Sequence, residues 1–328
     1  MIVLAWSRLH GRVYMVDPRT YRNPHVKPDH VQTKSDIQQL LEAAGLRPRK
    51  RFGQHFLIDG NLMRRLAELA DIRETDVIIE VGSGTGGLTD LLACRAGRVI
   101  CIEIDRDLHA ILQDRFATNE NVNIICGDAL ASKHKVNEEL DATLTSLAAL
   151  PDSERPDVKL VANLPYQAAT PLVMNLLVDF PIVSTLCFSV QQEVGLRMTA
   201  EPGSRDFGPL TLISSLNADV EIAARLRPEV FWPRPAVDSV LVTMTRKASL
   251  PIPQTEVRSF ARFVRSLFDQ RRKTLRAILR QSLGSEWLER IPWETLGIEP
   301  ERRPQSLSLP TWLELYDFHK KAAGDASA

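Results

Sequence analysis

The run Asn163-Leu164-Pro165-Tyr166 combines groups that could hold a flat base and present one of its amines to an electrophile. An exocyclic amine is a poor nucleophile because its lone pair is delocalised into the ring. The Asn163 side chain and a backbone carbonyl near Leu164 or Pro165 could accept both N–H bonds and favour a more tetrahedral nitrogen. Pro165 would stiffen the turn, and Tyr166 offers a ring for stacking. Positioning and electrostatics would then supply most of the rate. The alternative is an ordinary turn with Asn as a cap and Tyr as a core residue.

A glycine-rich run, Gly82–Gly86, follows the first predicted strand and could bind a nucleoside. Glycines there let the backbone approach a ligand and aim helix N–H groups at it. Glu103 ends the second strand, 21 residues after Gly82, where nucleotide-binding folds place an acid for the ribose hydroxyls. Asp128 ends the third strand, where a carboxylate could accept from an adenine amine. Each acid alone could be a helix cap or a solvated loop residue, but three successive strand ends favour nucleoside binding. The GxGxG spacing of Gly82, Gly84 and Gly86, together with the run that follows the fourth strand, favours S-adenosylmethionine over NAD, although Gly87 also completes the GxGxxG of dinucleotide sites.

Short apolar runs alternate with longer amphipathic ones, and this alternation predicts an α/β fold with a doubly wound parallel sheet. The predicted strands are Val77–Val81, Arg98–Ile104, Val122–Cys126, Val158–Ala162 and Thr185–Val190. The predicted helices between them lie near 86–96, 106–117, 134–149 and 169–178. An earlier helix is predicted to begin at Ser35–Gln38 and to stop at Gly45. The segment 132–156 is long for a crossover, so we expect it to carry a surface excursion.

Composition and turn signals divide the chain into three parts. Residues 1–34 lack sustained periodicity, and we expect a loosely ordered extension. Residues 35–250 form the sheet domain, in which two further strands, Asp219–Leu226 and Ser239–Thr245, could close one edge as an antiparallel hairpin. Prolines at 251 and 253 mark a linker, and short helices dominate from there to residue 328. We therefore expect 251–328 to be a small helical domain.

One stretch, 258–280, is strongly basic in a chain whose formal net charge is zero. It contains eight Lys and Arg residues against one acid, with apolar residues interleaved at helical spacing. An amphipathic basic segment in an otherwise neutral protein is typical of a phosphate-binding surface. The alternative is a solvated helix face without a partner.

These stretches make the chain resemble the KsgA family of ribosomal RNA small-subunit adenine dimethyltransferases, over roughly residues 35 to 320. The resemblance is carried by Arg51–Leu57, the Gly82 loop, Asn163–Tyr166, Gln192–Val194 with Arg197, Phe231–Ser239 and Phe268–Arg276. It implies a Rossmann-like S-adenosylmethionine-dependent methyltransferase domain over 35–250 and an RNA-binding helical domain over 251–328. It also implies dimethylation of N6 of two adjacent adenosines near the 3′ end of 16S rRNA. The implied partner is the small ribosomal subunit, with a role in its biogenesis.

The same resemblance implies which residues act. The implied cofactor-binding residues are His55, Leu57, Gly82, Gly84, Glu103, Asp128 and Asn163. The implied catalytic residues are Asn163, Leu164, Pro165, Tyr166 and Phe231. The implied RNA-binding residues are Arg265, Arg271, Arg272, Lys273 and Arg276. The family often has Asn where this chain has His55, and both side chains can hydrogen-bond a methionine moiety. Phe231 would form a second aromatic face of the target-base pocket, although it could equally be a core aromatic before a Pro-rich turn.

Three other functions compete with this one. A sister methyltransferase acting on large-subunit rRNA is the nearest, but Gln270–Thr274 and Phe231–Ser239 favour the small-subunit type. A non-catalytic ribosome assembly factor could use the same fold, although the intact Asn163–Tyr166 loop and Glu103 argue against lost activity. A nicotinamide dehydrogenase would need a hydride-site acid or base beside its glycine-rich loop, and we find none.

Composition narrows the remaining classes. Hydrophobic residues make up 44% and charged residues 25% of the chain, which is ordinary for a globular protein. The four cysteines form no CxxC pair and most histidines show no ligand spacing, so we expect no disulfide framework and no metal. No apolar run approaches the roughly 18 residues needed to cross a bilayer, and MIVLAW is too short for a signal-peptide core. We therefore expect a cytoplasmic protein without a membrane partner, and a monomer as the simplest state.

Overall fold

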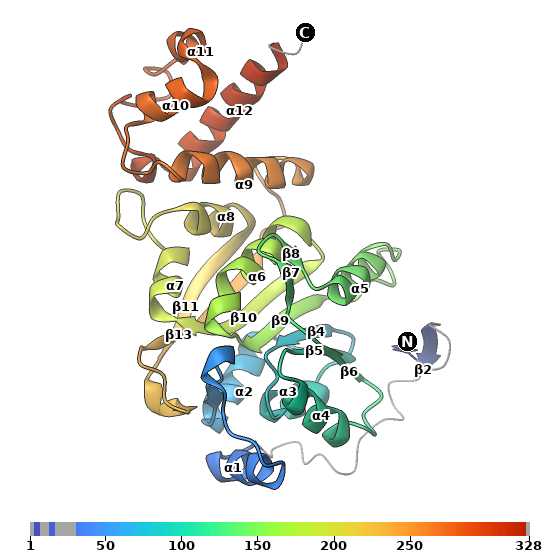
Figure 1. The fold of residues 1–328 in the computed structure, drawn as a ribbon. Helices are drawn as coiled ribbons and strands as arrows, with labels where there is room; N and C mark the ends of the chain where they lie inside the picture. Colours follow the sequence, from blue (N-terminus) through green and yellow to red (C-terminus); the bar gives the residue numbers. More distant parts are fainter. Residues whose placement is uncertain (1–2, 7–12, 17–30, 326–328) are drawn as a thin grey trace. The chain divides into compact units, whose positions relative to one another are not determined.

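A seven-stranded sheet places several of the residues predicted to do chemistry at the ends of its strands (Figure 1). The computed structural model describes residues 3–6, 13–16 and 31–325. The strand order is β11-β13-β10-β9-β4-β5-β6. The strands are β4 (Val77–Val81), β5 (Arg98–Glu103), β6 (Val122–Cys126), β9 (Val158–Asn163), β10 (Val183–Gln191), β11 (Ala218–Leu226) and β13 (Ser239–Arg246). The five strands from β10 to β6 are parallel, and β13 is antiparallel to β10. The predicted doubly wound sheet is confirmed, and each predicted strand ends within two residues of the observed one.

Parallel strands of this kind are buried on both faces, which explains their continuous apolar sequences. All five residues of β4 are buried, and so are the first five of β9. Because parallel strands share a direction, the chain leaves β4, β5, β6 and β9 at one edge of the sheet. Ligands of open α/β sheets bind outside this edge. The topology therefore brings together the four strand ends that the sequence singled out.

Helices flank the sheet and connect its strands (Figure 1). They are α1 (Lys34–Ala43), α2 (Gly60–Leu69), α3 (Gly87–Ala93), α4 (Arg106–Arg115), α5 (Glu138–Ala148), α6 (Tyr166–Asp179), α7 (Gln192–Met198) and α8 (Pro209–Asn217). The four predicted connecting helices correspond to α3, α4, α5 and α6. The helix predicted to be capped near Ser35 is capped instead by Thr33, whose hydroxyl accepts from the Asp36 N–H while the Asp36 carboxylate accepts from Thr33.

Short two-stranded ladders complete this part of the chain. β3 (Phe56–Leu57) pairs antiparallel with β12 (Phe231–Trp232). β7 (Leu130–Ser132) pairs with β8 (Lys135–Val136), so the predicted excursion at 132–156 consists of the end of this hairpin followed by the crossover helix α5. Of the predicted extension 1–34, β1 (Val3–Trp6) and β2 (Val13–Val16) form an antiparallel ladder. Gln32 is buried, and the segments 1–2, 7–12 and 17–30 lie outside the described residues.

The chain separates into two compact units. The first comprises residues 1–176, 180–195 and 221–246 and contains most of the sheet. The second comprises residues 177–179, 196–220 and 247–328. It contains α8, α9 (Gln254–Phe268), α10 (Leu275–Leu283), α11 (Ser285–Arg290) and α12 (Leu309–Asp325). The expected helical C-terminal region is therefore present, and α8 belongs with it although it precedes residue 251. Among the described residues, no helix is long and apolar enough to span a bilayer.

The basic stretch 258–280 folds as two helices and not as one. α9 ends at Phe268, and α10 begins at Leu275 with Thr274 as its cap. The interleaved apolar residues Phe260, Phe263, Val264, Leu267, Leu275 and Ile278 are all buried. They form the core of the helical unit, which explains their spacing. Arg271, Arg272 and Lys273 lie in the exposed turn between the two helices.

Candidate active site

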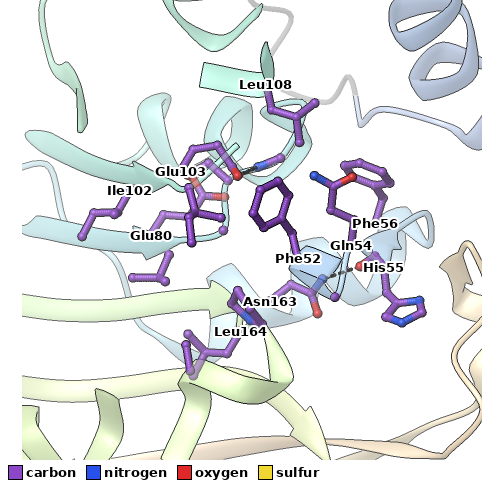
Figure 2. A pocket seen from close by; sticks show the side chains of 18 of the residues that line it. Phe52, Gln54, His55, Phe56, Glu80, Ile102, Glu103, Leu108, Asn163 and Leu164 are labelled. Carbon is purple, nitrogen blue, oxygen red and sulfur yellow. Dashed lines mark hydrogen bonds between the residues drawn. The ribbon is translucent and has the colours of Figure 1, made fainter. Parts of the chain in front are cut away.

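A single cavity collects the residues at the carboxyl ends of β4, β5, β6 and β9 (Figure 2). Gly82, Glu103, Asp128 and Asn163 all line it, one from each strand end. The segment 51–57, between α1 and α2, lines it as well. All of these residues belong to the first compact unit. The sequence therefore predicted the cavity from residues up to 80 positions apart, because it predicted which strand ends share an edge.

The glycine loop is shaped by its contacts with two other segments. Gly82 and Gly84 have φ angles of +76° and +61°, a region that side chains rarely tolerate. A Cβ atom on Gly82 would lie 2.9 Å from Cγ of Pro165, and one on Gly84 would lie 3.0 Å from the ring of Phe56. Any larger residue would have to displace these neighbours. The glycines are therefore required both by backbone conformation and by close packing.

Glu103 lies buried at the end of β5, with its carboxylate held by the backbone. Its Oε2 accepts the N–H of Gly84 at 2.8 Å, and its Oε1 accepts the N–H of Asp105 at 2.9 Å. Burial raises the pKa of Glu103 to about 7, and the backbone donors only partly offset this effect. Each oxygen keeps acceptor capacity for a further donor. A ligand that offers two hydroxyls could donate one further hydrogen bond to each oxygen of this desolvated carboxylate.

Glu80, in β4, is a second buried carboxylate that the sequence did not single out. It is 2% exposed and accepts the hydroxyl of Thr89 at 2.6 Å. Burial raises the pKa of Glu80 to about 7 as well. Its side chain borders the cavity, but its hydrogen bond ties β4 to α3. Glu80 lies inside a predicted strand and not at its end, so the search for polar residues at strand ends did not find it.

Asp128 differs from the two glutamates because it is exposed. Its Oδ1 accepts the N–H of Leu130 at 2.9 Å, and its backbone carbonyl accepts the side-chain amide of Asn137 at 3.0 Å. These contacts fix the turn after β6 and leave the second carboxylate oxygen for a ligand. Asp128 can therefore accept from an amine at the rim of the cavity.

Asn163, the last residue of β9, is held at both ends of its amide. Its Nδ2 donates to the carbonyl oxygen of His55 at 2.9 Å (Figure 2), and its Oδ1 accepts the hydroxyl of Ser189. Leu164, the next residue, is buried. The amide thus keeps one N–H and one acceptor position for a ligand, as the proposed chemistry requires.

Tyr166 begins α6 and faces His55. Their rings stack with centroids 5.8 Å apart, and the Tyr166 hydroxyl lies 2.8 Å from the Ser239 hydroxyl. The His55 ring is turned away from Glu103 (Figure 2). Its Nδ1 lies 2.6 Å from the Pro233 carbonyl oxygen, which can only accept, so Nδ1 carries a proton. His55 therefore lines the cavity as expected, but its ring extends toward the catalytic loop.

Phe231 and Leu57 occupy the β3–β12 ladder directly opposite each other. Both are buried, at 3% and 7% exposure, in the same apolar cluster. Leu57 also lines the cavity, whereas Phe231 does not. The structure thus places Phe231 as a core aromatic, the alternative that the sequence left open, and the ring facing Tyr166 belongs to His55.

Three further contacts lie at or beside the cavity and were not predicted. Gln32 is 3% exposed, and its Oε1 accepts the Thr85 hydroxyl at 2.7 Å. Gln54 donates to the Asp105 carboxylate at 2.8 Å, and Arg49 forms an ion pair with the same carboxylate at 2.6 Å. All three contacts join segments far apart in sequence, so no local sequence pattern predicts them. Arg49 also forms an ion pair with Asp107.

Comparison with known proteins decides the family. A family model described as Ribosomal RNA adenine dimethylase matches residues 45–321. The chain belongs to this family. Ribosomal RNA small subunit methyltransferase A of Moorella thermoacetica is 39% identical over 286 residues, covering 86% of this chain and 96% of that protein. The protein of the same name from Geobacillus thermodenitrificans is 34% identical and covers 87% of this chain and 95% of its own length.

Solved structures agree with the dimethylase fold. A dimethyladenosine transferase from Plasmodium falciparum has a TM-score of 0.63 and 25% identity, covering 81% of this chain and 98% of that one. The 23S rRNA methyltransferase ErmE has a TM-score of 0.57 and 23% identity, over 80% and 98% of the two chains, and supports the fold alone. The expected family and the Rossmann-like methyltransferase fold are confirmed. As a member of the dimethylase family, the chain is an S-adenosylmethionine-dependent rRNA adenine dimethyltransferase.

The cavity of this dimethylase fits S-adenosylmethionine on its own chemistry. Gly82 and Gly84 have no room for side chains. The buried Glu103 carboxylate can accept further hydrogen bonds besides its two from the backbone, and Asp128 offers its second carboxylate oxygen at the rim. Among the described residues, no cluster of His, Cys, Asp or Glu could hold a metal ion. The polar groups are those that a nucleoside with two ribose hydroxyls and an adenine amine would satisfy.

The predicted RNA-binding residues lie in the helical unit of the dimethylase. Arg271, Arg272, Lys273 and Arg276 are exposed, whereas Arg265 is half-buried on α9. Arg271 donates to the Arg205 carbonyl at 3.0 Å, and Arg276 pairs with Glu301 at 3.3 Å. Exposed pairs of this kind are weak, so these cations can exchange partners. The structure brings four of the five residues to one exposed turn and the first turn of α10.

Proposed function

We propose that this protein uses S-adenosylmethionine to dimethylate N6 of two adjacent adenosines near the 3′ end of 16S rRNA during small-subunit biogenesis. The observation that carries the proposal is the Asn163 amide, fixed by the His55 carbonyl in the same cavity as Glu103. The small-subunit relatives at 39% and 34% identity support the choice of substrate over large-subunit RNA. We expect the reaction in the cytoplasm, where bacterial ribosomal subunits are assembled.

The cofactor end of the cavity would work through three groups. The Glu103 carboxylate accepts the two ribose hydroxyls, and Asp128 accepts from the adenine amine of the cofactor. The backbone of the Gly82 loop approaches the ligand closely because it carries no side chains there. The cofactor supplies an electrophilic methyl group on a sulfonium. The protein contributes orientation, and orientation alone can provide much of the acceleration.

The target end would hold the adenine that is to be methylated. The Asn163 Oδ1 and a backbone carbonyl near Leu164 accept the two N–H bonds of the amine and make its nitrogen more tetrahedral. Tyr166, anchored through its hydroxyl to Ser239, provides the stacking face. No strong general base would be needed. As the nitrogen bonds to the methyl carbon, the carbon–sulfur bond would break and leave S-adenosylhomocysteine, and the cationic nitrogen would be acidic enough to lose its proton to water. After one transfer, the remaining N–H still has two acceptors within the loop.

Structured RNA must release the target base before it can react. Extruding one base costs roughly a few kcal/mol, which contacts to the surrounding backbone must offset. We assign this role to the helical region 251–328, through Arg265, Arg271, Arg272, Lys273 and Arg276. Their clustering around the turn between α9 and α10 supports the assignment. We expect the protein to bind the particle as a monomer.

The decisive test is mass spectrometry of rRNA after incubating unmethylated small subunits with the protein and S-adenosylmethionine. We expect four new methyl groups on two neighbouring adenosines near the 3′ end, and none with the Asn163→Ala variant. Methylation of large-subunit RNA alone would reassign the substrate. Binding to the particle without methylation would instead support a purely structural role in assembly.

A further inference from the structure

Ser189 touches the catalytic loop although it lies outside every motif described above. It is in β10, the strand next to β9, and stands in register with Asn163. Because these parallel strands are paired at this position, the two side chains emerge side by side from the sheet. Ser189 contacts the loop twice. Its hydroxyl donates to Oδ1 of Asn163, and its carbonyl accepts the Leu164 N–H at 3.3 Å.

The direction of the Asn163 amide follows from its two partners. The His55 carbonyl can only accept, so Asn163 must present its NH2 group there. Its oxygen then faces Ser189, whose hydroxyl can donate. The reversed amide would place two acceptors against each other at His55. The carbonyl therefore sets the orientation, and the Ser189 hydroxyl restrains the oxygen end that the target amine must meet.

Ser189 is suited to restraining Asn163 and not to binding a ligand. It is 1% exposed, and it is absent from the residues that line the cavity. A hydrogen bond in such a dry environment is stronger than one in water, and removing its donor leaves the Asn163 amide held only at its NH2 end. We propose that Ser189 is a positioning residue that holds the Asn163 amide oxygen at the point where it accepts the target amine. This inference rests on the proposed function.

β10 itself provides a matched control. Ser184 lies in the same strand, and its hydroxyl donates to the Val158 carbonyl of β9 at 3.3 Å. Both serines thus bridge β10 to β9 through a hydroxyl, but Ser184 lies at the other end of the strand, away from the catalytic loop. Removing the Ser184 hydroxyl should have the same effect on the sheet without affecting the amide of Asn163.

The experiment measures single-turnover methyl transfer to unmethylated small subunits for wild type, Ser189→Ala, Ser189→Thr and Ser184→Ala. The wild type is assayed first, because its failure to methylate would refute the proposed function and not the role of Ser189. For Ser189→Ala we expect the rate at saturating substrate to fall roughly tenfold, the fold-change of one buried hydrogen bond. S-adenosylhomocysteine affinity and KM for the particle should stay within twofold. Ser189→Thr, which keeps the hydroxyl, should recover most of the rate, and Ser184→Ala should match wild type.

Two outcomes would overturn the inference. The first is an unchanged rate for Ser189→Ala in a folded protein, as judged by its melting temperature. The second is an equal loss in Ser189→Ala and Ser189→Thr, because packing and not the hydroxyl would then be responsible. Should either variant fail to fold, Ser189→Cys, with a thiol that is a much weaker donor, replaces it. A Cys variant with full activity would count against the hydrogen bond.

Discussion

Glu103 leads to a quantitative prediction about pH. Its buried carboxylate has a pKa of about 7 in the ligand-free protein, because burial disfavours the charged form. If the cofactor's ribose hydroxyls donate to this carboxylate, the ligand binds the ionised form. Ligand binding must then compete with protonation. The affinity for S-adenosylhomocysteine should therefore rise with pH across the neutral range.

The size of the effect follows from that pKa. At pH 6 only about one tenth of Glu103 is ionised, and at pH 8 about nine tenths is. The apparent Kd at pH 6 should thus be roughly tenfold higher than at pH 8. At pH 7, binding should release about half a proton per protein molecule, because the ligand lowers the pKa of Glu103.

Titration calorimetry in buffers of different ionisation enthalpy measures both quantities at once. Glu103→Gln keeps an acceptor but cannot titrate, so its affinity should be weaker and should lose most of the pH dependence. Glu80→Gln removes the other buried carboxylate with a pKa of about 7 and should leave the pH dependence intact. A Glu103→Gln variant with the wild-type slope would refute the assignment of Glu103 as the titrating ligand.

Three other changes test the remaining parts of the molecule. The pKa of Glu80 in the folded protein is about 7, above the usual value of 4.5, so the fold loses stability relative to the unfolded chain as pH rises between these values. The free energy of unfolding of Glu80→Gln relative to wild type, measured by chemical denaturation, should therefore be higher at pH 8 than at pH 5 by on the order of 2 kcal/mol. Equal differences at both pH values would contradict burial as the cause. Charge reversal of Arg271 and Arg272 should weaken particle binding and flatten its salt dependence, whereas an unchanged affinity across a salt series would mean that the turn is only solvated. Asn163→Ala should abolish methyl transfer while only weakening S-adenosylhomocysteine binding, and normal turnover would eliminate its proposed role.

The sheet edge was predictable because its information is local. Each strand is a short apolar run ended by a polar residue, and Gly82, Glu103, Asp128 and Asn163 each follow or end one. Parallel topology then places their ends together without any knowledge of side-chain contacts. The structure confirmed this edge and the alternating helices. It also gave α1 a different cap, since Thr33 and Asp36 satisfy each other reciprocally.

The contacts between distant segments were not predictable. Ser189 opposes Asn163 only because β10 pairs with β9 in one register, and a single sequence does not specify the register between parallel strands joined by a helical crossover. Gln32 meets Thr85 across 53 positions through a buried hydrogen bond with no motif of its own. Phe231 illustrates the same difficulty, because an aromatic before a Pro-rich turn fits a pocket wall or a core equally well. Such residues need tertiary structure before a role can be assigned.

The tight packing of the glycine loop has a consequence for engineering. Gly82 is in contact range of Pro165, in the catalytic loop, and Gly84 is in contact range of Phe56, next to His55. The glycine loop proposed to bind the methyl donor is therefore packed directly against the segments proposed to bind the target base. Enlarging the loop region to admit donors with bulkier transferable groups would shift the acceptor site as well.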